Sequence, residues 1–182
     1  MRTAFIWTCM FVIMLGGTPQ AQQGAGSPGR TFVSFVPVDT VTVAPGHKTP
    51  VAFTFHVEKG YHINSNKPLA EELIPTQLHF TLPGEIVIGK VEYPAGALMS
   101  FPFDPTQKLS VYSDDVVIRA VVLAPQEAQP GPLTVHGELK YQACDNNACY
   151  PPKKLPITFN VKIGANTARH RARGNAQSPH IH

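Results

Sequence analysis

The sequence predicts an all-β protein, an immunoglobulin-like β-sandwich of about eight short strands. Many short runs alternate apolar and polar residues, which is the period of a half-buried strand. Prolines and glycines stand between these runs, and they favour turns because proline presets φ and glycine permits positive φ. Helix signals are few: only residues 71–73 suggest a short helical turn, and no internal repeat or phosphate-binding glycine loop is present.

The strands of the first half follow from this alternation. Residues 31–43 alternate around a break at Pro37, and residues 51–57 alternate without a break. Residues 77–82 and 86–91 show the same period, and turn signals follow both. We therefore expect four strands in this half, each with one buried face.

The second half adds four more strands. Residues 108–112 alternate, whereas residues 116–123 form a nearly continuous apolar run. Such a run favours a strand that is buried on both faces or central to a sheet. Residues 133–141 and 155–163 complete the set, after the turn signal at residues 130–132.

The N-terminus has the order of a secretory signal peptide over residues 1–21: a positive start at Arg2, an apolar run over residues 5–15 and small Ala21 before the cut. The run is shorter than the about 20 residues that a membrane-spanning helix needs. We therefore expect an exported protein that has no membrane span in its mature chain.

The remaining chain predicts one domain with two polar ends. Residues 22–30 predict a flexible lead, and residues 164–182 predict a disordered basic tail that contains histidines. Residues 31–163 form the predicted domain, with ten Lys/Arg and twelve Asp/Glu, although the whole chain has a net charge of +3. A slightly acidic domain without a basic stripe gives no support to nucleic-acid binding.

Two cysteines are the main candidates for a functional site. Cys144 and Cys149 lie outside the expected signal peptide, which contains the third cysteine, Cys9. They flank a turn between two predicted strands, and an exported chain keeps such a pair oxidised. A loop this short stabilises the fold by only roughly 2 kcal/mol. The spacing alone leaves two interpretations open, a permanent structural clip and a reversible dithiol.

The surroundings of the two thiols differ. Asp145 adjoins Cys144, and a nearby carboxylate disfavours a thiolate. Cys149 has no adjacent acid, and Lys153 and Lys154 follow it. We therefore expect Cys149 to exchange with a partner through a mixed disulfide and Cys144 to be the resolving thiol.

The segments around the cysteines resemble a known family. Tyr141-Gln-Ala-Cys144 and Cys149-Tyr-Pro-Pro152, with four residues between the cysteines, are similar to the N-terminal periplasmic domain of the thiol:disulfide interchange protein DsbD. Residues 61–68 and 108–112 resemble the same family. The resemblance covers most of residues 31–163 and implies an immunoglobulin-like domain with a redox-active cysteine pair.

The resemblance also implies partners. Such a domain takes electrons from a thioredoxin-like domain that is fed by a membrane electron carrier. It passes them to periplasmic disulfide isomerases and to thioredoxin-like proteins of cytochrome c maturation. This sequence ends after the first domain, so we expect either that a separate membrane carrier and a separate thioredoxin-like protein serve it, or that it has kept the fold and left the pathway.

The same resemblance implies a cap over the cysteines. The matching region is residues 97–107, in which Phe101 or Phe103 would be the cap, although Pro102 and Pro105 depart from the family pattern. Tyr141 and Tyr150 are candidates to line the site, and the polar residues 64–66 most simply make turn hydrogen bonds.

The sequence-based hypothesis is therefore an exported thiol–disulfide exchange protein with protein-disulfide reductase activity and without a cofactor or metal. The alternative is a non-enzymatic immunoglobulin-like binding module whose Cys144–Cys149 disulfide is permanent.

Overall fold

A computed structural model describes residues 30–165 of the chain. The predicted signal peptide over residues 1–21 lies outside the described residues. Almost all of the predicted lead and tail, residues 22–29 and 166–182, lies outside them as well. The predicted domain over residues 31–163 lies wholly within them.

The domain is built from strands, and no helix forms between residues 30 and 165. The twelve strands are β1 Val33–Val36, β2 Val41–Val43, β3 Lys48–Val57, β4 His62–Asn64, β5 Gln77–Thr81, β6 Val87–Ile88, β7 Ala97–Phe101, β8 Asp104–Tyr112, β9 Asp115–Leu123, β10 Gly131–Tyr141, β11 Ala143–Cys144 and β12 Lys153–Ile163. The all-β, immunoglobulin-like class is confirmed. The count exceeds eight because residues 31–43 form two strands and because β4, β7 and β11 were not predicted.

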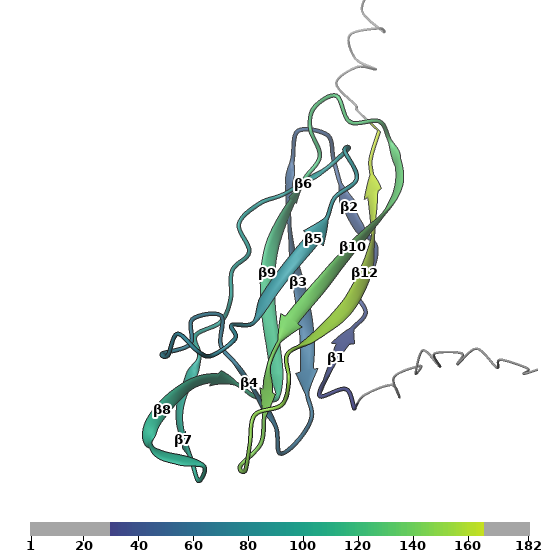
Figure 1. Cartoon of the computed structure of the whole chain (residues 1–182). Helices are drawn as coiled ribbons and strands as arrows, with labels where there is room; N and C mark the ends of the chain where they lie inside the picture. The colour runs from purple at the N-terminus through teal and green to yellow at the C-terminus, as the bar shows by residue number, and fades with distance from the viewer. Residues whose placement is uncertain (1–29, 166–182) are drawn as a thin grey trace, which may run out of the picture. The chain divides into compact units, whose positions relative to one another are not determined.

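Two four-stranded sheets form the sandwich (Figure 1). One has the order β1-β3-β9-β6, and the other has the order β2-β12-β10-β5. Phe53 of β3 packs edge-on against Phe159 of β12, with ring centroids 5.0 Å apart. Phe80 of β5 contacts Phe53 as well, at 5.2 Å. The core therefore lies between the two sheets and is joined across them by aromatic side chains.

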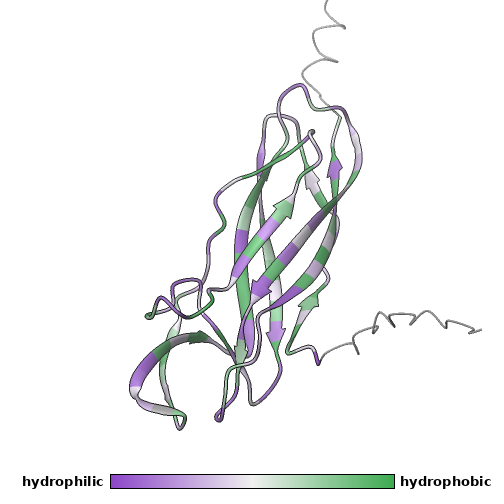
Figure 2. Ribbon diagram, in the orientation of Figure 1, coloured by the Kyte–Doolittle hydropathy of each residue, from purple (hydrophilic) through white to green (hydrophobic). Residues whose placement is uncertain are grey.

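Alternation explains which faces are buried. Along β3, Val51, Phe53, Phe55 and Val57 point into the core, as their spacing predicts. Figure 2 shows the same alternation as bands of hydrophilic and hydrophobic residues along β10 and β12. Burying one such side chain contributes about 1.5–3 kcal/mol, so the paired sheets hold most of the stabilising apolar surface.

Strand β9 is central, as its apolar run predicts. It pairs with β3 on one side and with β6 on the other. Its core-facing residues alternate with half-buried Val117, Val121 and Leu123 on the outer face. Continuous apolar character here reflects an outer face that is partly covered, rather than full burial on both faces.

A third sheet, of order β11-β4-β8-β7, brings together the segments that matter for function (Figure 1). Its strands β7 and β8 form a hairpin over residues 97–112. The sequence predicted a strand at residues 108–112 but only a capping loop over residues 97–107. Phe101, Leu109 and Val111 form a small second core under this hairpin. Gly96 stands at its base, where a Cβ atom would come within 2.8 Å of Ser65 Cβ. Only glycine at position 96 therefore lets the base of the hairpin approach Ser65 so closely.

Candidate functional site

The cysteine turn connects β11 with β12. Cys144 and Cys149 form a disulfide and also pair as an isolated antiparallel bridge. Asp145 closes the turn, because its backbone N–H donates to the Ala148 carbonyl oxygen at 2.9 Å. The Asp145 carboxylate oxygen Oδ1 accepts hydrogen bonds from the backbone N–H groups of Asn147 and Ala148. Short polar residues therefore shape this turn by bonding to its own backbone.

The two cysteines differ sharply in burial. Cys144 is 0% exposed and lies at the end of β11, whereas Cys149 is exposed on the far side of the turn. A thiolate from another protein can approach Cys149 but not Cys144. This asymmetry agrees with the order of reactivity that the sequence predicted.

The Asp145 carboxylate is held inside the turn. The Tyr150 hydroxyl donates to its second oxygen at 2.7 Å. That bond, with the two backbone bonds, lowers the pKa of Asp145 below its usual range, and the same carboxylate raises the pKa of Tyr150 to about 12. At neutral pH the site therefore contains an ionised carboxylate and a neutral phenol.

His62 is the neighbour of Cys144 on the other side. It lies in β4 directly opposite Cys144 in β11. Side chains at directly opposed positions stand on the same face of a sheet, with Cβ atoms about 4.5–5.5 Å apart. Because Cys149 is opposite Cys144 in turn, His62, Cys144 and Cys149 form one row across the small sheet.

The His62 imidazole is buried and neutral. Its side chain is only 4% exposed, and its Nε2 atom has no hydrogen-bond partner within the described part of the chain. Burial lowers its pKa to about 4, although the negative charge of Asp145 opposes this shift. The sequence left two interpretations of His62 open, a residue that tunes a neighbouring thiol and an ordinary strand-end histidine, and only the strand register shows that it faces Cys144.

The structure separates the two candidate cap residues. The Phe101 ring stacks on the His62 imidazole with centroids 3.8 Å apart, and Phe101 is 5% exposed. Phe103 stacks on Phe101 from outside at 5.6 Å and is 38% exposed. Phe101 therefore reaches the cysteine row by covering His62, and Phe103 lies one layer further out.

The two candidate tyrosines have different places. Tyr141 is 1% exposed in the main core, and its hydroxyl is hydrogen-bonded to the backbone of Phe32 and Val33. Tyr150 lies beside the cysteine turn and packs against the Phe32 ring at 4.7 Å. Tyr61 joins this cluster, at 4.8 Å from Phe32. Sequence reasoning did not select Phe32, because its spacing is that of any core residue of an edge strand.

A polar network fastens the turn to the domain. Gln142 donates to the Tyr150 carbonyl oxygen and accepts from the Asn64 side chain, both at 3.2 Å. Asn64 also donates to the Ile74 carbonyl oxygen, and the Ser65 hydroxyl accepts from the Lys67 N–H. The predicted turn-bonding role is thus confirmed for Ser65. Asn66 instead accepts a hydrogen bond from the Tyr112 hydroxyl, and Asn64 fixes the exit from the cysteine turn.

Comparison with known proteins identifies the family. The family model described as "Thiol:disulfide interchange protein DsbD, N-terminal" matches residues 32–160. The chain belongs to this family. The family's domains are periplasmic and carry out thiol–disulfide exchange, and the resemblance that the cysteine motif predicted is confirmed.

Two solved structures are similar to the chain. The DsbD N-terminal domain of Neisseria meningitidis, in its reduced form, is 18% identical with a TM-score of 0.41, over 61% of this chain and 76% of that one. The N-terminal periplasmic domain of ScsB from Proteus mirabilis is 12% identical with a TM-score of 0.41, over 79% of this chain and 51% of that one. This chain thus spans about half the length of the ScsB structure. No curated protein matches the chain significantly.

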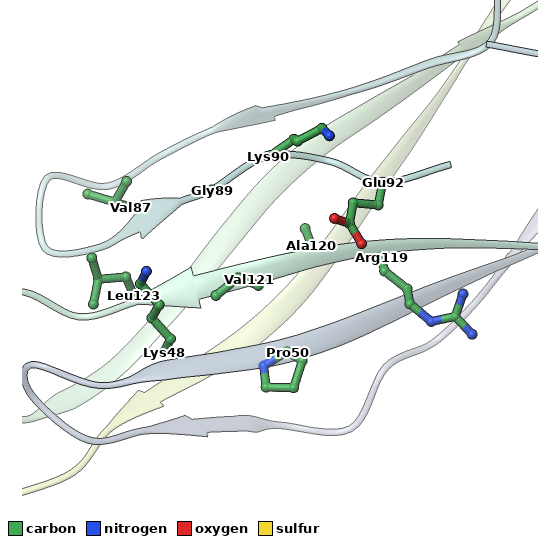
Figure 3. A pocket seen from close by; sticks show the side chains of 10 residues that line it. All are labelled: Lys48, Pro50, Val87, Gly89, Lys90, Glu92, Arg119, Ala120, Val121 and Leu123. Atoms are coloured by element: carbon green, nitrogen blue, oxygen red, sulfur yellow. The ribbon is translucent and has the colours of Figure 1, made fainter. Parts of the chain in front are cut away.

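A separate groove lies on the outer face of the sheet formed by β3, β9 and β6 (Figure 3). Its volume is about 460 Å³, and Val87, Val121 and Leu123 contribute apolar surface to it. None of its lining residues belongs to β4, to β11 or to the cysteine turn. The groove is therefore not part of the DsbD-type site.

Two further properties concern the described residues alone. Between residues 30 and 165, no group of three or more His, Cys, Asp or Glu side chains is placed to hold a metal ion. Over the same residues, no helix is long and apolar enough to cross a membrane.

Proposed function

We propose that this protein is an exported thiol–disulfide exchange protein that works through Cys144 and Cys149. It passes reducing equivalents from a thioredoxin-like donor to periplasmic acceptor proteins. The observation that carries the proposal is the burial asymmetry of a disulfide at a turn, with one cysteine open to a partner and the other enclosed. Membership of the DsbD N-terminal family supports the same conclusion.

Reduction begins at the exposed cysteine. A thiolate of the donor attacks Cys149 Sγ, the Cys144–Cys149 bond breaks, and its electron pair leaves on Cys144 Sγ. A second donor thiol then attacks the donor sulfur of the mixed disulfide and releases Cys149. The donor ends as a disulfide, and the domain ends as a dithiol after gaining two electrons and two protons.

Oxidation reverses these steps with a different partner. The Cys149 thiolate attacks a disulfide of the acceptor and forms a second mixed disulfide. Cys144 then attacks Cys149 Sγ, which restores the internal disulfide and releases the acceptor as a dithiol. Only Cys149 has to reach the partners, which suits its place at the surface.

The location of the disulfide suits repeated opening. The bond closes a short loop, so opening it removes only roughly 2 kcal/mol of stabilisation. The turn keeps its backbone hydrogen bonds and its attachment to Asn64 through Gln142. The domain can therefore stay folded in both redox states.

The cap controls access in this proposal. Phe101 covers the row at its His62 end, and it moves aside with the β7–β8 hairpin when a partner docks. Thioredoxin-like proteins, disulfide isomerases and thioredoxins of cytochrome c maturation are the partners proposed, with a separate membrane carrier as the source of electrons. The compartment proposed is the periplasm, after removal of the signal peptide.

Trapping of mixed disulfides tests the proposal. The Cys144→Ser variant, mixed with an oxidised thioredoxin-like protein, should accumulate a mixed disulfide through Cys149. The matched Cys149→Ser variant leaves only buried Cys144 and should trap much less. Absence of any trapped species from both variants, with a wild-type disulfide that resists reduction until the domain unfolds, would establish a permanent clip and a binding module instead.

A further inference from the structure

Breaking the disulfide creates a charge in a buried place. When a donor attacks Cys149, the negative charge develops on Cys144, which is fully buried at the end of β11. A buried thiolate without a hydrogen-bond donor is strongly disfavoured. The nearest acid, Asp145, cannot help because it is ionised and already accepts three hydrogen bonds.

One buried polar atom near Cys144 is unused in the disulfide form. His62 stands opposite Cys144 on the same face of the small sheet. Its Nε2 atom is enclosed and has no hydrogen-bond partner among residues 30–165. Buried polar atoms are nearly always paired, so an unpaired one calls for an explanation.

We propose that His62 Nε2 is the hydrogen-bond partner that the Cys144 sulfur takes when the disulfide opens. This inference rests on the proposed exchange at Cys144–Cys149. The neutral imidazole donates a hydrogen bond from its Nε2–H to the departing Cys144 thiolate. The thiolate afterwards takes up a proton from solvent, to which the thiols of the donor protein have released theirs. Nε2 is unpaired in the disulfide form because Cys144 Sγ is then bonded to Cys149 and carries no charge.

The packing around His62 suits this role. Phe101 covers one face of the imidazole ring at 3.8 Å, and the Nε2 atom itself is enclosed, so solvent does not hydrogen-bond to it. Burial keeps the ring neutral, with its pKa lowered to about 4, and the charged group acting on it is Asp145 in the cysteine turn. His62 thus connects the cap to the sulfur that leaves.

Two substitutions of His62 test the effect of the Nε2–H donor and the effect of the aromatic ring separately. His62→Phe keeps an aromatic ring for Phe101 to stack on and removes the donor. His62→Gln keeps a polar donor and removes the ring. Loss of the donor should weaken the dithiol state relative to the disulfide, by about tenfold in the equilibrium constant for reduction. For a two-electron couple this equals a fall of about 30 mV in reduction potential.

The experiment is equilibration of each folded domain with dithiothreitol redox buffers, followed by counting of alkylated thiols. We expect His62→Phe to lower the potential by about 30 mV and His62→Gln to change it by less than about half of that. An unchanged or raised potential in His62→Phe, or equal falls in both variants, would overturn the inference. If the wild-type pair cannot be reduced in the folded domain, it is the proposed exchange function that fails.

A second measurement uses the unaltered protein, so it does not depend on how the variants fold. The imidazole nitrogens of His62 can be followed by NMR in the oxidised and reduced domain. We expect the Nε2 resonance to move on reduction as it gains the Cys144 sulfur as a partner. An Nε2 resonance that stays in place, while the cysteine signals report full reduction, would contradict the inference.

Discussion

The Phe101 ring lies flat on the His62 imidazole, with centroids 3.8 Å apart and planes 15° apart. His62 in turn faces Cys144 across the β4–β11 pair. Phe101, the proposed cap, therefore lies over the histidine that stands beside the buried Cys144. This relationship links the position of the β7–β8 hairpin to the environment of the disulfide.

Removal of the Phe101 ring should open the site. Phe101→Ala is expected to speed reduction of the disulfide by dithiothreitol severalfold, because the small second core loses its largest side chain. It should also lower the free energy of unfolding by about 3 kcal/mol, at the lower end of the range for buried aromatic residues. Reduction kinetics and denaturant unfolding measure the two effects.

Phe103→Ala is the matched control. Phe103 is 38% exposed and stacks only on the outer side of Phe101. Its loss should change the reduction rate little and the free energy of unfolding by less than about 1 kcal/mol. Equal acceleration by both substitutions would show that the hairpin as a whole, and not the ring of Phe101, shields the cysteines.

The His62 imidazole should make stability fall in mildly acidic solution. In the unfolded chain this histidine takes up a proton below its ordinary pKa of 6.5, whereas in the folded domain it does so only near pH 4. Stability is therefore lost as the pH falls from about 6.5 towards 4, at up to about 1.4 kcal/mol per pH unit. Unfolding midpoints over this range should fall less in His62→Phe than in the wild type.

The Asp145 carboxylate should affect the stability of the domain at a lower pH than His62 does. The folded turn lowers its pKa from 3.8 through the bonds from Tyr150, Asn147 and Ala148. Its contribution is therefore fully present above the unfolded value and is lost as the pH falls below about 3.8 towards the folded pKa. The difference in unfolding midpoint between wild type and Asp145→Asn should shrink over that range; a constant difference would mean that the carboxylate charge is irrelevant to the turn.

The reduced domain should remain folded. Opening a loop of this size costs roughly 2 kcal/mol, and the network from Asn64 through Gln142 to Tyr150 does not depend on the disulfide. Denaturant unfolding should show one cooperative transition for the oxidised domain and one for the reduced domain. Their free energies of unfolding should differ by roughly 2 kcal/mol. A reduced domain without a cooperative transition would indicate that the bond is a structural necessity.

Much of the sandwich could be predicted because its strands alternate. All eight expected runs correspond to strands of the paired sheets or to β8, and the central place of β9 followed from its apolar run. The third sheet was missed for physical reasons. All three residues of β4 are buried, four of the five residues of β7 are exposed, and β11 has two residues, so none of them shows a period of two.

The candidate site was predicted in part. The cysteine pair and the turn residues could be expected from the sequence alone, whereas the greater exposure of Cys149 could not, because the sequence ranked the two thiols only by their neighbouring charges. The choice between Phe101 and Phe103 could not, because both are aromatic and only two positions apart. Tyr141 and Tyr150 look equivalent as strand-end aromatics, yet one lies in the core and the other holds Asp145.

The sequence by itself determined the all-β class, the family and the cysteine pair at the turn. These are properties of periodicity, composition and short motifs, which are written along the chain. Only the tertiary structure decided that His62 stands beside Cys144 and that Phe101 covers His62. Those contacts depend on strand register, and a shift of one residue in β4 would turn His62 to the opposite face of its sheet.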